Sequence, residues 1–265
     1  MRSSVNGLQV AYTDEGKGIP LLFVHGFPFA RGIWSRQVAA FKANHRVLAP
    51  DLRGFGESQG TPGKVTMRTY ADDLFALLQG LHAPPAILVG HSMGGYIAMA
   101  FANAYPEALR GLVLVGTKAG PDVPEVAEAR RELARRVQTE GTSAVVSVMG
   151  SKMLSIQNHD ADLAKSVKVM MGLAKPEGVI SALLGMADRP DAGPGLKDIE
   201  TRTLVISGAM DDVIPPSEAG ALMMAFPGAQ LRLIPNAGHL VAYEQPDAFN
   251  EALRAWLAWG EDSNN

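Results

Sequence analysis

The residues VGHSMGG at positions 89–95 form the most informative pattern in this chain. An apolar run at 86–89 precedes them, and a run of mostly small residues at 96–104 follows. A short buried strand that ends in G-x-S-x-G and turns at once into a helix is typical of a nucleophile elbow. The glycines at 90 and 94 stand where a Cβ would collide across so tight a turn. The pattern therefore predicts Ser92 as a nucleophile rather than as an incidental serine in a glycine-rich turn.

The composition of the 265 residues is that of an ordinary globular protein, with 47% hydrophobic and 19% charged residues. A net charge of −3 without a basic cluster argues against a nucleic acid partner. The chain has no cysteine, which excludes disulfides, thiolate catalysis and cysteine-ligated metals. The first twenty residues lack an apolar signal core and no run reaches membrane-spanning length, so we expect a cytoplasmic protein without a membrane partner.

Apolar runs alternate with helical patterns in the first 116 residues and again from about residue 203. The patterns predict strands at 7–13, 20–24, 46–49, 86–89, 111–115, 203–207 and 230–234, the first of them an antiparallel edge strand. They predict helices at 34–41, 69–81, 96–104, 217–226 and 246–259. Continuous apolar strands that alternate with helices indicate an α/β fold with a mostly parallel sheet and helices on both faces.

The alternation stops between residues 117 and 197, where the sequence contains no convincing strand. Helical patterns there cover residues 123–137, 142–154, 160–174 and 176–187, and a Gly/Pro linker at 191–195 follows them. We interpret residues 117–197 as an inserted helical lid, and residues 1–116 together with 198–265 as the core domain.

A serine hydroxyl needs a base within hydrogen-bond reach and an acid that holds the base in the right tautomer. His239 follows Gly238 in a loop directly after the last predicted strand, at the carboxyl edge of the sheet, and is the best candidate for the base. The acid should come from a strand end between Ser92 and His239. Asp211 and Asp212 both lie in such a loop, and the spacing G-x-x-D-x-x-x-P favours Asp211.

Acyl transfer also needs hydrogen-bond donors for the developing oxyanion. The N–H group after the nucleophile belongs to Met93, at the start of a helix whose dipole favours negative charge. The loop after the strand at 20–24 should supply the second donor, and Phe27 is placed for it. Met93 and Phe27 are therefore predicted to form the oxyanion hole through their backbones.

Taken in order, five motifs resemble the α/β-hydrolase superfamily. They are HGFP at 25–28, D-x-R-G-x-G-x-S at 51–58, GHSMGG at 90–95, G-x-x-D at 208–211 and GH at 238–239. The resemblance implies a mainly parallel eight-stranded sheet, a triad of Ser92, Asp211 and His239, and no cofactor or metal. The loop at 51–58 would then be structural rather than catalytic. The lid sequence is generic and carries no part of the resemblance.

The residues at the matched positions narrow the chemistry. The resemblance implies an aspartate at the position of Ser92 in haloalkane dehalogenases and epoxide hydrolases, so those branches are disfavoured. Cofactor-free haloperoxidase-like esterases share SMGG but usually differ at Tyr96 and Ile97. We therefore expect a serine hydrolase that cleaves carboxylic esters of small to medium size through an acyl-enzyme. The alternatives are an enol-lactonase-like enzyme, a carbon–carbon bond hydrolase, or a non-catalytic small-ligand receptor on the same fold.

The substrate, a small-molecule ester or lactone, should contact residues from the loops and the lid. Lys118 lies just past a strand end and could touch a substrate or pair with a lid acid. Met149 and Met153 are among the lid methionines that could form an adaptable apolar lining, although packing of the helices on the core is the simpler explanation for them. His25 flanks the site and is a further candidate, with orientation of its own loop as the alternative.

Overall fold

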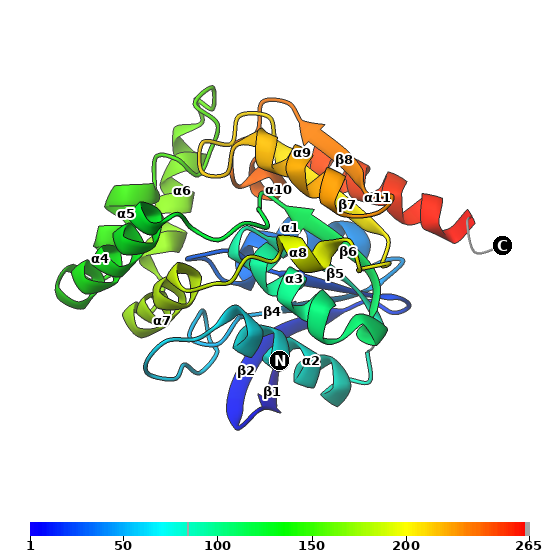
Figure 1. Cartoon of the computed structure of the whole chain (residues 1–265), viewed down its shortest axis with the longest axis horizontal. Helices are drawn as coiled ribbons and strands as arrows, with labels where there is room; N and C mark the ends of the chain where they lie inside the picture. The colour runs from blue at the N-terminus through cyan, green and yellow to red at the C-terminus, as the bar shows by residue number, and fades with distance from the viewer. Residues whose placement is uncertain (84, 263–265) are drawn as a thin grey trace.

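The computed structural model describes residues 1–83 and 85–262, and an eight-stranded sheet runs through its centre (Figure 1). The strand order is β1-β2-β4-β3-β5-β6-β7-β8. β1 and β2 are antiparallel to their neighbours, and all the other pairs are parallel. In chain order the strands are β1 Arg2–Val5, β2 Leu8–Glu15, β3 Pro20–Val24, β4 Arg46–Pro50, β5 Ala86–His91, β6 Leu109–Val115, β7 Thr203–Gly208 and β8 Gln230–Ile234.

The central strands are buried along almost their whole length because helices cover both faces of the sheet. Their register pairs Val24 with Gly90 and Gly90 with Leu114, so β3, β5 and β6 end at the same edge. The carboxyl ends of β7 and β8 lie at that edge as well, since Gly208 pairs with Ile234. The loops that follow these strands therefore meet above the centre of the sheet, where α/β folds place their sites.

Two groups of helices sandwich the sheet. α2, α3 and α8 pack together on one face, while α1 and α11 pack together on the other (Figure 1). α9 packs on β7 and β8. The helices are η1 Arg31–Trp34, α1 Ser35–Phe41, α2 Met67–Gly80, α3 Met93–Ala104, η2 Pro106–Ala108, α4 Pro124–Glu140, α5 Ser143–Met149, α6 Ala161–Gly172, α7 Pro176–Ala187, α8 Gly193–Leu196, α9 Pro216–Ala225, α10 Val241–Glu244 and α11 Pro246–Asp262.

Helices α4 to α7 form one group between β6 and β7, which we call the helical insert, and Figure 1 shows it at the side of the sheet away from the C-terminus. α7 joins the insert to the core through two backbone contacts that leave no room for a side chain. A Cβ on Gly178 would collide with the carbonyl oxygen of Gly54, and one on Gly185 with that of Val65. The Val65 N–H also donates to the Ser181 carbonyl at 3.2 Å.

The two ends of the helical insert lie next to each other. The N–H of Ala192 donates to the carbonyl of Ala119 at 3.2 Å. The Arg189 guanidinium donates to the carbonyl of Gly120 at 2.9 Å. The chain therefore enters and leaves the insert through a paired neck.

Three of the predicted elements need correction. The strand predicted at 7–13 is not at the edge, because β1 pairs with β2 on its outer side. α5 ends at Met149 rather than near residue 154, since the following backbone bonds to the core instead of continuing the helix. The linker at 191–195 contains the start of a short helix, α8.

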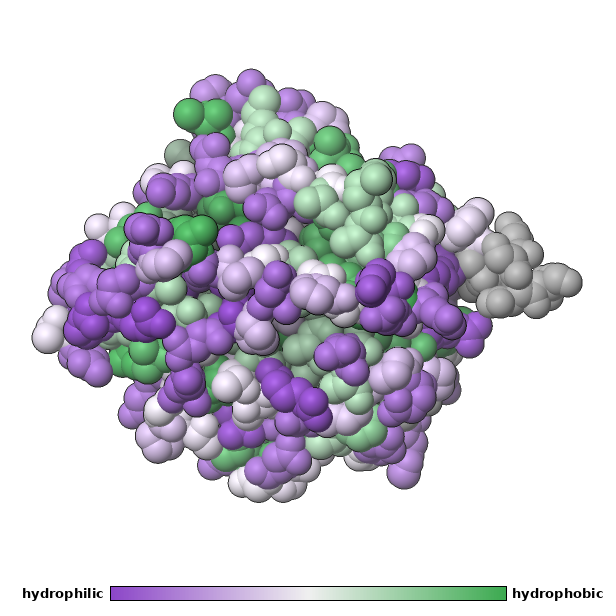
Figure 2. Space-filling model, in the orientation of Figure 1, coloured by the Kyte–Doolittle hydropathy of each residue, from purple (hydrophilic) through white to green (hydrophobic). Residues whose placement is uncertain are grey.

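Figure 2 shows a mostly hydrophilic surface with small apolar patches on the visible face. Within residues 1–83 and 85–262, no single helix has both the length and the apolar composition needed to cross a membrane. α6 and α7 meet that test only as a pair that is bent by 91°.

Candidate active site

Ser92 occupies a strained turn between β5 and α3, with φ 53° and ψ −114°. A residue other than glycine adopts positive φ only where its surroundings enforce it. The Ser92 N–H donates to the Val115 carbonyl at 2.8 Å, and the Thr117 hydroxyl donates to the Ser92 carbonyl at 2.9 Å. A Cβ at Gly90 would collide with the Gly94 carbonyl. The turn therefore holds the Ser92 side chain away from both strand and helix.

His239 stands between Ser92 and Asp211 in one continuous chain of hydrogen bonds. Its Nε2 lies 2.9 Å from the Ser92 hydroxyl oxygen, and its Nδ1 lies 2.8 Å from a carboxylate oxygen of Asp211. The three residues come from the loops after β8, β5 and β7. Ser92 keeps 9% of its surface exposed, while the other two are buried. This arrangement can activate a hydroxyl as a nucleophile.

Asp211 is held as a carboxylate by its surroundings. Its second oxygen accepts the N–H groups of Val213 and Ile214, each at 2.8 Å. Burial by itself would raise the pKa of Asp211, but His239 and these two N–H groups outweigh it and hold the pKa below its ordinary value. Asp212, the other candidate acid, is exposed. The geometry thus joins Asp211, and not Asp212, to His239.

His91 lies next to His239 and holds the loop that carries His239 in place. Its Nε2 donates to the His239 carbonyl at 2.9 Å, and the centres of the two rings are 4.9 Å apart. Burial, followed by repulsion from a charged His239, lowers the pKa of His91 to about 3. His91 is therefore a neutral donor to the backbone of the His239 loop.

Glu244 on α10 is a positioning residue that the sequence did not suggest. One of its carboxylate oxygens accepts the Gly238 N–H at 2.7 Å, and the other accepts the Ser155 N–H at 3.0 Å and the Asn158 amide at 2.7 Å. A Cβ at Gly238 would collide with the backbone of Leu154 and Ser155. Glu244 thus clamps the stretch before His239 to the segment after α5. Its only sequence signal is a carboxylate two residues before the start of α11.

The two N–H groups predicted for the oxyanion hole border the elbow. Neither the Met93 N–H nor the Phe27 N–H has an acceptor among the residues that the structure describes. The loop that carries Phe27 comes this close because Gly26 lacks a side chain. A Cβ there would lie 3.0 Å from the Cβ of Ser92 and 2.5 Å from Nδ1 of His91. The positions of both donors suit a charge that develops beside Ser92.

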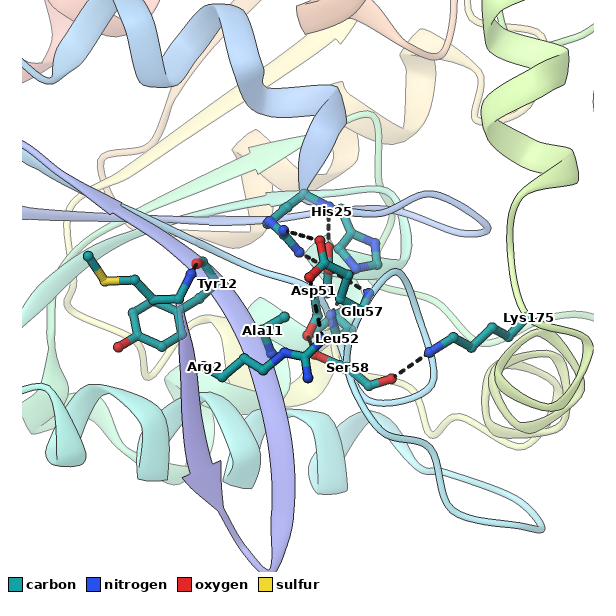
Figure 3. Close-up of polar contacts among 11 residues, drawn as sticks. Arg2, Ala11, Tyr12, His25, Asp51, Leu52, Glu57, Ser58 and Lys175 are labelled. Carbon is teal, nitrogen blue, oxygen red and sulfur yellow. Dashed lines mark hydrogen bonds and ion pairs between the residues drawn. The ribbon is translucent and has the colours of Figure 1, made fainter.

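His25 does not reach the substrate region, so its prediction as a substrate contact is not supported. Its ring is fully buried, with Nδ1 donating to the Gly26 carbonyl at 3.0 Å and Nε2 accepting the Leu52 N–H at 2.9 Å. Both ring nitrogens are thus occupied by backbone, and Figure 3 shows the contact with Leu52. His25 ties the loop after β3 to the loop after β4.

The loop at 51–58 is organised by Asp51, as Figure 3 shows. The Asp51 carboxylate pairs with the Arg31 guanidinium and accepts the Glu57 N–H at 2.9 Å. The Ser58 hydroxyl donates to the Asp51 carbonyl at 2.7 Å, and Lys175 reaches from the helical insert to the Ser58 carbonyl at 3.0 Å. These contacts give the loop a structural role, and they add a polar link to the glycine contacts of α7.

A cavity of about 150 Å³ lies beside Ser92. Of the predicted substrate contacts, Lys118 and Met149 line it. Met153 does not, since its side chain is fully buried and its carbonyl accepts the Leu240 N–H. The other lining residues are Phe27, Tyr96, Asp122, Val126, Arg130, Met186, Val213 and Ile214. Val126, Arg130 and Met186 were missed because they come from the insert, whose helical patterns do not tell which face meets the core.

Known proteins share this fold along its whole length. Residues 21–252 match the model of the alpha/beta hydrolase family. A thermophilic esterase from Thermogutta terrifontis, solved with malate bound, is 40% identical with a TM-score of 0.95, and the match covers 98% of each chain. The enol-lactonase from Burkholderia xenovorans LB400 is 25% identical with a TM-score of 0.91, over 97% of this chain and 100% of that one.

A protein of Mycobacterium tuberculosis, provisionally named the non-heme bromoperoxidase BpoC, is 31% identical over 258 residues. The match covers 95% of this chain and 98% of that protein. The strand order, the elbow and the extent of the family match agree with one another. This chain therefore belongs to the alpha/beta hydrolase family.

Proposed function

We propose that this protein is a serine hydrolase that cleaves carboxylic esters of small to medium size through an acyl-enzyme intermediate. The observation that carries the proposal is the hydrogen-bond chain from the Ser92 hydroxyl through His239 to Asp211, with distances of 2.9 and 2.8 Å. Membership of a hydrolase family supports it, as does the likeness to an esterase at 40% identity.

In the proposed reaction, the Ser92 oxygen attacks the ester carbonyl carbon while Nε2 of His239 takes the hydroxyl proton. Asp211 stabilises the imidazolium that forms, and the N–H groups of Met93 and Phe27 stabilise the oxyanion. The tetrahedral intermediate collapses, and the alcohol leaves with the proton from His239. A water molecule then attacks the acyl-enzyme by the same route, which releases the carboxylic acid and restores Ser92.

A lactonase activity is the second candidate, and the likeness to the enol-lactonase favours it. A lactone is a cyclic ester, so the same residues would perform the same steps on it. The ring would open into one hydroxy acid, with the leaving alcohol still attached to the acyl group. Ester and lactone substrates should therefore be compared on the same enzyme preparation.

The test is Ser92→Ala, assayed with p-nitrophenyl butyrate, with a set of small lactones and with a fluorophosphonate probe. Loss of the nucleophile should lower kcat by about 10⁴ or more and abolish labelling. Ser207→Ala is the matched control, because that serine is also buried near a strand end, but among the described residues its hydroxyl bonds to the Gly208 carbonyl alone. Labelling that persists in Ser92→Ala would overturn the assignment of the nucleophile.

A further inference from the structure

A cluster of three cations around one acid borders the cavity beside Ser92. Asp122 is buried in the loop between β6 and α4. Its carboxylate lies 2.5 Å from the Arg130 guanidinium, 2.9 Å from that of Arg189 and 3.7 Å from the Lys118 ammonium. Burial alone would raise the pKa of Asp122, but the bonds from Arg189 and Arg130 hold it below its ordinary value. With Asp122 ionised, the cluster carries an excess of two positive charges.

Arg189 has a structural role within this cluster. It is 3% exposed, it donates to the carbonyls of Met186 and Gly120, and its guanidinium lies 4.1 Å from the centre of the Tyr96 ring. These contacts brace the neck of the helical insert against the elbow helix α3. Arg189 does not line the cavity beside Ser92. Its guanidinium pairs with the Asp122 carboxylate.

Lys118 and Arg130 differ from Arg189 because they line the cavity and keep about a fifth of their side-chain surface exposed. At 3.7 Å from Asp122, Lys118 is beyond hydrogen-bond distance and keeps its three N–H donors. Arg130 bonds Asp122 through Nε alone, and its two terminal nitrogens have no partner among the described residues. Asp122 is the only acid among the lining residues that the structure describes.

Lys118, Arg130 and Arg189 share the single carboxylate of Asp122, so two positive charges remain uncompensated beside a partly buried, mostly apolar cavity. This excess charge is costly to desolvate unless an anion joins it. The rest of the lining consists of Ser92, the aromatic rings of Phe27 and Tyr96, two methionines, two valines and an isoleucine, none of which carries a negative charge at neutral pH. The fork of an arginine and the point charge of a lysine both suit a carboxylate. A carboxylate on the substrate would supply the missing negative charge.

We propose that Lys118 and Arg130 form an anion subsite beside Ser92, and that the preferred substrates are esters that carry a free carboxylate. This inference rests on the proposed ester hydrolysis at Ser92 and adds the substrate class. The carboxylate can belong to the acyl part, as in a half-ester of a dicarboxylic acid, or to the alcohol part, as in an acylated hydroxy acid. In either case the charge orients the ester toward the nucleophile.

The experiment compares charged esters with neutral partners of equal length at pH 7. For the acyl side, the monoethyl esters of succinate, glutarate and adipate are set against ethyl butyrate, pentanoate and hexanoate. For the alcohol side, O-acetyl lactate is set against isopropyl acetate. Proton release gives kcat/KM for each, and we expect the wild-type enzyme to favour the charged member of at least one pair by about tenfold.

The variants Lys118→Met and Arg130→Gln should each lower that charged-to-neutral ratio by about tenfold. Arg136→Gln is the matched control, because Arg136 lies on the same helix α4 with its guanidinium on Glu140 at the surface. It removes the same charge and should keep the wild-type ratio. A wild-type preference for the neutral esters, or a ratio that Lys118→Met and Arg130→Gln leave unchanged, would overturn the subsite.

Binding separates failure of the subsite from failure of the proposed function. In Ser92→Ala, glutarate should raise the unfolding temperature more than glutaramide does, and Lys118→Met or Arg130→Gln should remove this difference. Absence of ester hydrolysis together with this selective binding would overturn the proposed function and keep the subsite. Ester hydrolysis without any selective effect of glutarate would keep the proposed function and overturn the subsite.

Discussion

Among single residues, His91 shows how a buried side chain can serve a site without taking part in its chemistry. It donates from Nε2 to the His239 carbonyl, while its Nδ1 is buried without a hydrogen-bond partner in the described part of the chain. Protonation would place a charge in a fully buried position next to the His239 ring, which is why the folded state keeps His91 neutral. That preference must make the stability of the fold depend on pH.

The sign of this dependence follows from the two pKa values of His91. Its pKa is about 3 in the folded chain and about 6.5 when unfolded, so between these values the unfolded state binds more protons. The free energy of unfolding should therefore fall by about 2 kcal/mol between pH 7 and pH 5 on account of His91. His91→Gln keeps an amide donor but cannot titrate, and urea unfolding at the two pH values should show a correspondingly smaller fall. An equal fall in both proteins would contradict this.

The choice between the two neighbouring acids can be tested directly. Asp211→Asn removes the carboxylate that holds the His239 tautomer and should lower kcat by about 10⁴. Asp212→Asn changes an exposed side chain and should alter kcat by no more than a few-fold. Steady-state kinetics on one p-nitrophenyl ester measures both, and similar losses in the two variants would show that neither geometry nor spacing identifies the acid.

The sequence was most informative where chemistry restricts the local backbone. Ser92, Asp211 and His239 stand at strand ends with recognisable spacing, and the structure brings them within hydrogen-bond distance. Asp122 and Arg130 could not be placed in the same way. Their positions depend on how the insert packs on the core, and an amphipathic helix shows only that one of its faces is buried.

At the level of elements, the segment after α5 is the least helical part of the predicted lid. Residues 150–160 contain no helix because their polar groups bond to Glu244, and the Leu240 N–H donates to the Met153 carbonyl. Such tertiary partners cannot be recognised from local propensity. β1 was missed for a related reason, since its polar residues gain strand structure only by pairing with β2.

Glu244→Gln tests the clamp that α10 provides. The glutamine amide keeps one acceptor oxygen, but its NH₂ group replaces the other oxygen and faces N–H donors. At least one buried N–H group therefore loses its acceptor. We expect the free energy of unfolding to fall by about 1–3 kcal/mol. Glu251→Gln on the exposed side of α11 is the control and should be neutral. Denaturant unfolding compares the two, and equal stabilities would show that Glu244 does not hold the insert to the His239 loop.

At the level of the whole molecule, we expect the space around Tyr96 to limit the size of the substrate. Tyr96 lines both the 150 Å³ cavity beside Ser92 and a second cavity of about 330 Å³. A void of about 150 Å³ holds a molecule of the size of benzene. The first cavity alone should therefore accept short acyl or alcohol groups.

This size limit predicts a chain-length optimum. Across p-nitrophenyl esters from two to sixteen acyl carbons, we expect kcat/KM to rise by about 0.8 kcal/mol per buried methylene and then fall beyond about six carbons. Tyr96→Ala removes the wall that the two cavities share, and it should move the optimum to longer chains. An unchanged optimum in Tyr96→Ala, or a wild-type optimum at sixteen carbons, would show that the cavity does not set the substrate size.

The two ends of the helical insert meet at its neck, so residues 119–192 can be exchanged as one unit. Because Ala119 and Ala192 already share a hydrogen bond, a foreign insert joined at these residues would bridge its ends without a new linker. This unit contains Asp122, Arg130 and Arg189. It does not contain Ser92, Asp211 or His239. Recombination between related chains at this neck would therefore exchange Asp122, Arg130 and Arg189 in one step, while Lys118 and the three residues of the hydrogen-bond chain stay in place.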